Sequence, residues 1–181
     1  MNDDHVIVYP TPDPVKLAQI LKAIRANEYR PYEIRAAIEE FGDAHYWEAV
    51  PEMKKLLQHE DSDVRYSALE VLTLNFRLPE LWENARAFLE YDSDDNCRML
   101  GASCLQVLKR NTGDERTLAV LARVVANEYE KDKFVRKAAY LAMRGVIAYD
   151  RKEQRTSLRT FDLEKDVDWD LVRKYQHSPV D

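Results

Sequence analysis

Histidine and cysteine are the residue types of this chain that could most readily bind a metal or act as nucleophiles. Cys97 and Cys104 lie seven residues apart, without the CxxC spacing or the neighbouring histidine of a zinc site. On one helix their Cα atoms would be about 10 Å apart, beyond the reach of about 7 Å that a disulfide allows. No two histidines form a closely spaced pair on one predicted helix; they are His5, His45, His59 and His177. We therefore expect two buried free thiols, with no metal and no cofactor.

Motifs for phosphate binding and covalent catalysis are not found in the sequence either. The four glycines are scattered and form no glycine-rich loop that could surround a phosphate. There is no GxSxG motif to hold a nucleophilic serine. Asp and Glu are abundant, but their places at turns and on helix surfaces single out no acid–base pair. The sequence thus predicts no catalytic residue and favours a protein that is not an enzyme.

Composition and charge favour a globular, helical, cytoplasmic protein. Hydrophobic residues make up 45% of the chain, and no apolar run approaches the roughly 20 residues of a membrane span. The acidic start, residues 1–14, lacks the basic region and apolar core of a secretory signal. The formal charge is −9 over residues 1–104, +6 over 105–160 and −3 over 161–181. The basic zone, residues 105–160, is either a solvated helix surface or a docking patch for an anionic partner.

The elements that would position any site repeat along the chain. Arg35, Arg65, Arg98 and Arg136 each lie near the start of a predicted helix, and they are 30, 33 and 38 residues apart. Around each arginine the apolar residues recur at helical spacing, as one face of an α-helix requires. A second helix is predicted before each of these, over residues 13–27, 44–58, 78–91 and 113–129. The sequence predicts about four helical hairpins joined by mostly acidic turns.

One segment of the chain, residues 41–72, resembles a HEAT repeat of the short bacterial type that is also found in phycobilin lyases. The residues that carry the resemblance are Gly42-Asp43, Ala49-Val50-Pro51, Leu56-Leu57, Asp61-Ser62-Asp63 and Val64-Arg65 with Ala68 and Leu72. The likeness extends more loosely over residues 14–149. It implies an all-α, armadillo-like fold: a right-handed α-solenoid of about four HEAT-like hairpins, ending in a C-terminal capping helix. It also implies protein binding as the function.

Several repeat residues have an expected structural role. Asp63 is expected to cap the helix that follows it, and its carboxylate complements the helix dipole. Each arginine is expected to bond carbonyl or acidic groups in the turns of its own repeat or the next one. A small residue three positions after the arginine, such as Gly101, should let stacked repeats approach closely, and Pro51 should bend its helix. The structural set is Arg35, Asp63, Arg65, Arg98 and Arg136.

The two ends of the chain are expected to differ from the repeats. Residues 1–13 should form an N-terminal arm, and residues 14–149 the solenoid. Residues 150–181 should contain a polar linker and a capping helix over 160–176, because a solenoid needs polar-faced ends to remain soluble. Capping is the first interpretation of that helix, and partner binding the second.

The leading functional hypothesis is a non-catalytic scaffold or adaptor that binds another protein, of unknown identity, on its concave face. A toxin-neutralising immunity protein and a phycobilin-lyase-like protein are the alternatives. A HEAT-type iron hydroxylase would need several His-Glu pairs, and only His59-Glu60 is present. A HEAT-like DNA glycosylase would need a basic groove, which the acidic first half opposes despite three tryptophans, so nucleic acid is not an expected partner. The predicted binding residues are Tyr66, Glu70, Met99, Ser103, Gln106, Lys137, Leu141 and Arg144.

Overall fold

The computed structural model describes residues 13–130, 132–148 and 158–180, and these residues form helices and turns but no strand. The all-α fold class is therefore confirmed. Two short 3₁₀ helices, η1 (Trp47–Ala49) and η2 (Pro79–Leu81), precede α3 and α5. The α-helices are α1 (Pro14–Arg25), α2 (Pro31–Asp43), α3 (Val50–Leu56), α4 (Ser62–Leu74), α5 (Trp82–Tyr91), α6 (Asp95–Leu108), α7 (Glu115–Ala126), α8 (Lys133–Ile147) and α9 (Trp169–Tyr175).

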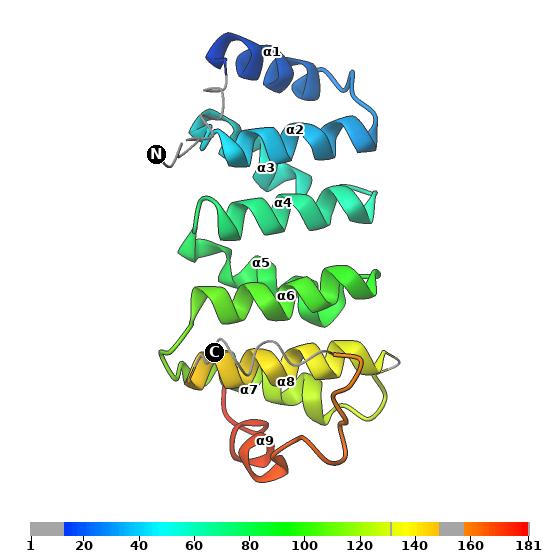
Figure 1. The fold of residues 1–181 in the computed structure, drawn as a ribbon, viewed down its shortest axis with the longest axis vertical. Helices are drawn as coiled ribbons and strands as arrows, with labels where there is room; N and C mark the ends of the chain where they lie inside the picture. The colour runs from blue at the N-terminus through cyan, green and yellow to red at the C-terminus, as the bar shows by residue number, and fades with distance from the viewer. Residues whose placement is uncertain (1–12, 131, 149–157, 181) are drawn as a thin grey trace, which may run out of the picture.

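The helices pair into hairpins that stack along the long axis of the molecule, as a helical solenoid requires (Figure 1). The second helix of each hairpin, here called the B helix, packs on the B helix of the next: α2 on α4, α4 on α6, and α6 on α8. The first helices α3, α5 and α7, here called A helices, lie behind this layer. Their apolar faces join in one continuous core that extends from Leu17 in α1 to Val180 near the C-terminus.

Aspartates begin most of these helices, but one of them is not the residue that the sequence predicted. The Asp61 carboxylate accepts the backbone N–H of Val64 at 3.1 Å, and Asp61 has the extended backbone of an N-cap. Asp63 lies inside the first turn of α4, so its assignment as the cap was wrong by two residues. Its charge still complements the positive end of the helix dipole. Asp13 and Asp114 cap α1 and α7.

Pro51 does not bend a long helix, which corrects the second local expectation. The segment predicted as one helix over 44–58 divides into η1 and α3, and Pro51 lies in the first turn of α3. A proline there loses no helical hydrogen bond, because the first N–H groups of a helix have no intrahelical partner. Pro79 begins η2 in the same way in the next hairpin. The prolines therefore mark where each A helix starts.

Gly101 permits a close approach of α6 to α5, whereas the sequence predicted a close approach to the next repeat. A Cβ at this position would lie 2.6 Å from both the Ala85 carbonyl oxygen and the Leu89 nitrogen of α5. The small residue thus brings α6 against its own hairpin partner, not against the next repeat. At Gly145 a Cβ would meet only the Gln106 side chain, which belongs to the neighbouring B helix α6.

The C-terminal segment, residues 158–180, lies against the last hairpin. The Phe161 ring lies 5.5 Å from the Tyr140 ring of α8, and the Asp168 N–H donates to the Tyr140 hydroxyl at 2.9 Å. The helix predicted over 160–176 is only Trp169–Tyr175, since Asp168 caps it at its start; this helix, α9, packs against α7. Residues 1–12 of the predicted arm and 150–157 of the predicted linker lie outside the described residues.

Substitution Gly101→Ala is expected to lower the free energy of unfolding by about 1–3 kcal/mol, because the added methyl group meets backbone atoms that cannot rotate away. Gly145→Ala is the matched control: it gains the same helix propensity, and the flexible Gln106 side chain can move aside. Urea denaturation of both variants checks this. Equal stability of the two variants would contradict the close approach at Gly101.

Candidate functional site

An arginine near the start of α4 connects two turns of the solenoid. Arg65 Nε and Nη2 donate to the two oxygens of Asp92 in the following hairpin, at 2.9 and 2.6 Å. Its Nη1 donates to the carbonyl oxygens of His59 and Glu60 in the preceding turn, both at 2.9 Å. The side chains are only 13% and 6% exposed, so this bidentate pair is largely shielded from water. The pair therefore fixes the register of two adjacent hairpins.

The corresponding arginines make the same connection with different degrees of burial. Arg98 pairs with Glu130 in the turn between α7 and α8, and both side chains are mostly buried. Arg35 pairs with Asp63 at 3.1 Å, but these side chains are 42% and 70% exposed. Arg136 donates instead to a carbonyl oxygen of α7, in its own hairpin. Each of these guanidinium groups is thus occupied by an acceptor within the chain.

The environment of Asp92 shifts its ionisation. Burial raises the pKa of the Asp92 carboxyl group, but the hydrogen bonds from Arg65 and from the backbone N–H of Asp94 outweigh it, so this pKa is lowered. A lowered pKa in the folded state means that the pair stabilises the fold above the ordinary Asp range. That stabilisation is lost as the pH falls below about 4 and passes through the folded-state pKa.

The two cysteines are buried free thiols, as the sequence predicted. Burial, helped by the nearby charges of Asp92 and Asp94, raises the pKa of Cys97 to about 12. Burial raises the pKa of Cys104 to about 12 as well. Because the thiolate is the reactive form, neither sulfur is suited to nucleophilic chemistry near neutral pH.

Three cations of the basic zone hold the C-terminal segment. Arg116 donates to the Val180 carbonyl at 2.7 Å, and Arg123 Nη2 donates to the Ser178 carbonyl, also at 2.7 Å. Lys137 Nζ donates to a carbonyl of the same segment at 3.0 Å. These contacts are internal, so the three side chains are already engaged by backbone carbonyl groups and are less available to an anionic partner.

The structure divides the eight predicted binding residues into an accessible and an inaccessible group. Ser103 is exposed on α6, and the half-buried members are Tyr66, Glu70, Met99, Leu141 and Arg144. Gln106 and Lys137 are corrections to the prediction, since they are only 9% and 6% exposed. Gln106 packs against Gly145 of the next B helix, and Lys137 lies beneath the C-terminal segment.

The accessible residues of α4 and α6 form two matched rows. Within each helix three of them follow one another at intervals of four residues, which keeps them on one face, and an arginine follows three residues later in the turn beyond the helix end. Corresponding members of the two rows are 33 residues apart, as repeat geometry requires. We call this surface the α4–α6 groove; it consists of Tyr66, Glu70, Leu74 and Arg77 on one side and Met99, Ser103, Val107 and Arg110 on the other.

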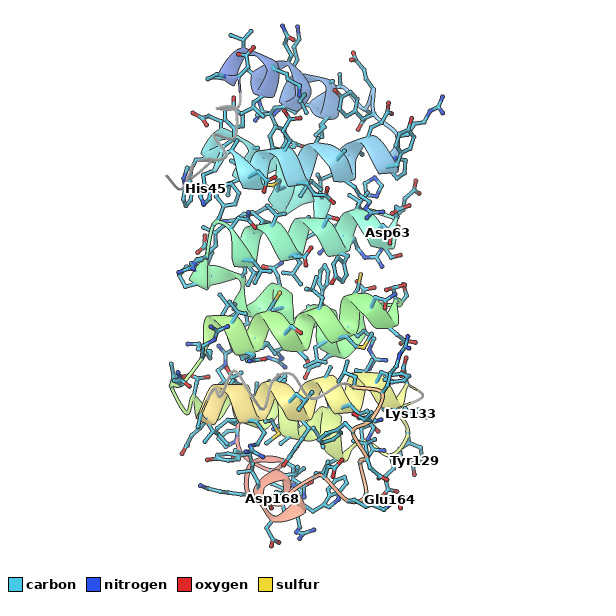
Figure 2. The ribbon with its side chains drawn as sticks, viewed as in Figure 1. His45, Asp63, Tyr129, Lys133, Glu164 and Asp168 are labelled. Atoms are coloured by element: carbon cyan, nitrogen blue, oxygen red, sulfur yellow. The ribbon has the colours of Figure 1, made fainter. Side chains whose placement is uncertain are left out.

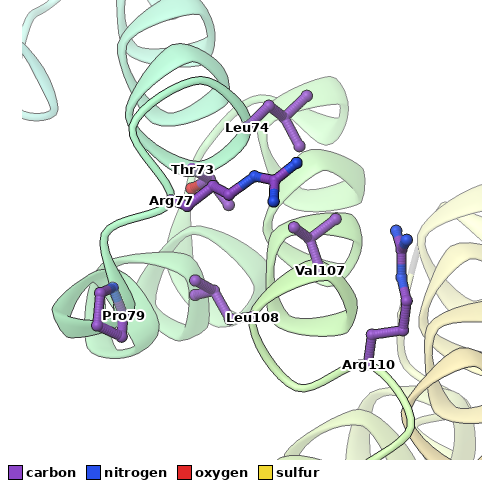
Figure 3. Close-up of a pocket in the computed structure, with 7 residues that line it drawn as sticks. All are labelled: Thr73, Leu74, Arg77, Pro79, Val107, Leu108 and Arg110. Atoms are coloured by element: carbon purple, nitrogen blue, oxygen red, sulfur yellow. The ribbon is translucent and has the colours of Figure 1, made fainter.

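One end of the α4–α6 groove contains a pocket of about 370 Å³, which is shown in Figure 3. The sequence prediction included none of its lining residues, and four of them continue the two rows: Leu74, Arg77, Val107 and Arg110. Counting four more residues from Glu70 and from Ser103 would have found Leu74 and Val107. The two arginines lie beyond the helix ends, where helical periodicity no longer predicts position.

The other end of the groove is acidic and partly shielded from water. Burial raises the pKa of Glu70, and the negative charge of Glu39 on α2 raises it further. Burial, together with the charge of Glu70, likewise raises the pKa of Tyr66. A cation brought close by a bound partner would lower the pKa of Glu70 again.

Arg77 has an unusual backbone conformation at the opposite end. Its φ of 53° lies in the left-handed region, which costs a residue other than glycine about 1 kcal/mol or more. His45 and Asn111 have φ of 48° and 58° in the corresponding turns after α2 and α6. Asn tolerates this conformation best among non-glycine residues, so an arginine is a costly choice here.

The edge formed by the turns between A and B helices carries exposed tyrosines. Figure 2 shows Tyr129 and Asp63 on this edge, with His45 on the opposite one. Tyr91, 77% exposed, lines a second pocket of about 350 Å³ at this edge. The charged residues of that pocket are Arg65 and Asp92, which already bind each other.

Other sites considered in the sequence take structural places. Within the described ranges no cluster of three His, Cys, Asp or Glu side chains could hold a metal ion. Trp82 is buried, and its indole N–H donates to the Thr117 hydroxyl at 2.7 Å, while Trp47 is exposed and packs edge-on against Phe76. None of the helices in the described part of the chain is long and apolar enough to cross a membrane.

The family model described as HEAT repeats matches residues 17–106, which extend from α1 to near the end of α6. This match coincides with stacked hairpins that have the Arg–carboxylate connection. The chain is a HEAT-repeat protein. Searches of curated proteins and of solved structures returned no match. The HEAT repeats therefore form the stacked B-helix layer that contains the α4–α6 groove.

The raised pKa values of Cys97 and Cys104 predict that neither thiol reacts with Ellman's reagent in the native protein at about pH 8. Both should react once denaturant unfolds the chain. The absorbance of the released thiolate measures the reaction. Rapid reaction of the native protein would contradict the burial of these side chains.

Removal of either Arg65 or Asp92 is expected to lower the free energy of unfolding by about 3 kcal/mol, because it leaves a buried charge unpaired. The double substitution Arg65→Met with Asp92→Leu should cost less than the sum of the single ones. The exposed pair Arg35–Asp63 is the control, and its removal should cost less than about 1 kcal/mol. Chemical denaturation gives these values, and equal costs at the two pairs would refute the difference in burial.

Proposed function

We propose that this HEAT-repeat protein is a non-catalytic adaptor that binds another protein in the α4–α6 groove. HEAT repeats are generally protein-interaction scaffolds. The observation that carries the proposal is the matched pair of rows, in which aromatic, Met and Arg side chains remain accessible between two B helices. These residue types are enriched where proteins bind one another.

The location of the groove is supported by what covers the other parts of the B-helix layer. The C-terminal segment lies over α8, where it contacts Lys137 and Tyr140. Gln106 packs between α6 and α8. The α4–α6 groove has no such cover among the described residues. Unlike the α6–α8 part of the layer, the groove is therefore within reach of a partner.

A photo-crosslinking amino acid at position 103 is expected to give a discrete adduct with one partner protein in a lysate of the native cells. The same amino acid at Ala87, exposed on α5, is the control for adducts that do not depend on the groove. Mass spectrometry identifies the partner. Identical adducts from both positions, or adducts from position 87 alone, would refute binding in the groove.

Two tyrosines provide a second comparison in the same experiment. Tyr66→Ala should reduce the adduct yield from position 103 at least about tenfold, as removal of a central aromatic contact does. Tyr91→Ala, at the end of α5 and outside the groove, should leave the yield unchanged. A bound bilin chromophore in the purified protein would instead favour the phycobilin-lyase alternative, and a nuclease toxin as the adduct would favour the immunity protein.

A further inference from the structure

The pocket at the end of the α4–α6 groove combines an apolar floor with two cations. Leu74 and Val107 form the floor, and Leu74 is 44% exposed despite being apolar. Arg77 and Arg110 line the same pocket, and Figure 3 shows Arg77 between Leu74 and Val107, with Arg110 beyond Val107. The pocket volume of about 370 Å³ suits a few side chains of a peptide.

The contacts within the described fold give no structural role to the Arg77 side chain. Among the described residues, none makes a hydrogen bond or an ion pair with it, and its backbone is left-handed. The structural arginines of the repeats, such as Arg65, are each occupied by carboxylate or carbonyl groups. A strained residue whose side chain makes no hydrogen bond or ion pair with the described fold indicates a role in binding something else.

We propose that this pocket binds a carboxylate-bearing segment of the partner protein, with an Asp or Glu side chain beside an apolar one. This inference rests on the proposed protein-binding function and specifies the chemistry of one end of that site. The guanidinium of Arg77 donates to the carboxylate, and Arg110 lines the pocket from the α6 side. The neighbouring apolar side chain of the segment packs on Leu74 and Val107.

Local charge favours such an anion in spite of the helix ends nearby. The carboxyl ends of α4 and α6 each contribute roughly half a negative charge, whereas Arg77 brings a full positive charge into direct contact with the bound carboxylate. A long polyanion such as nucleic acid fits less well, since Glu70 lies further along the groove and the chain carries a net charge of −6. One or two carboxylates match the pocket without meeting Glu70.

The groove is short enough for a small peptide to test the proposal. Its helical part extends eight residues along each B helix, or about 12 Å at about 1.5 Å per residue, and the pocket lies at its end. An extended peptide covers about 12 Å with about four residues. A seven-residue peptide therefore has the length to reach from the pocket to Tyr66 and Met99.

The experiment selects random seven-residue peptides, displayed on phage, on the immobilised full chain. We expect Asp or Glu next to Leu, Ile, Val, Phe or Met to be enriched at least about tenfold over the starting library. A fluorescent synthetic peptide of the selected sequence then gives the affinity by anisotropy. Replacing its Asp by Asn, or its Glu by Gln, should weaken binding about tenfold, and added salt should weaken it as well.

Arg77→Asn is the decisive variant, because Asn is better suited to the left-handed backbone and should melt no lower than the native protein. It should weaken peptide binding about tenfold, as should Arg110→Gln. Lys22→Gln removes an exposed cation from α1 and should change nothing. Melting curves from circular dichroism verify folding of each variant.

Three results would overturn the proposal: no selected peptides, selected peptides without an acidic residue, or binding that Arg77→Asn leaves unchanged. If the adduct from position 103 persists in any of these cases, the groove still binds a protein and only its acidic preference is wrong. If that adduct is missing as well, the proposed function fails together with this inference.

Discussion

The need of each helical hairpin to bury two apolar sides is the constraint on which the rest of the structure depends. A B helix such as α4 is apolar toward its own A helix and also toward the B helices before and after it. One hairpin cannot satisfy both sides, so hairpins stack and share one core. The same requirement makes the last hairpin incomplete, and the C-terminal segment supplies the missing cover through Phe161 and α9.

Burial decides how much each Arg–carboxylate link contributes to this stack. The pairs Arg65–Asp92 and Arg98–Glu130 are shielded in the middle, while Arg35–Asp63 is open to water near the N-terminal end. The same charges therefore hold the central hairpins in register and contribute little at the end. The two rows of the α4–α6 groove stay in register only if their own hairpins are held together. The two buried Arg–carboxylate pairs lie there, because their arginines belong to α4 and α6.

The repeat was predictable from the sequence because its pattern of arginines and apolar residues is local. Prediction failed where the backbone conformation selects one of two residues, or where a distant segment covers a residue. Two aspartates suit the cap of α4, and only the dihedral angles select Asp61. Residues more than twenty positions later cover Lys137. Periodicity placed half of the two rows, but Val107 continues the second row instead of Gln106, because the face turns gradually around the helix. Arg77 lies beyond the helix, in a left-handed turn whose direction no periodicity specifies.

The charge asymmetry of the chain has a structural explanation that also bears on where a partner binds. The +6 zone and the acidic C-terminus look like separate surfaces in the sequence, but Arg116, Arg123 and Lys137 use the later residues as acceptors. Positive charge in the second half thus serves to hold the end of the solenoid. Arg77 belongs to the acidic first half and takes no part in that arrangement. Arg77 is a single cation in an acidic region, beside the exposed Leu74, so it can select a ligand that is both anionic and apolar. The basic zone is less selective, because three of its cations hold the end of the solenoid.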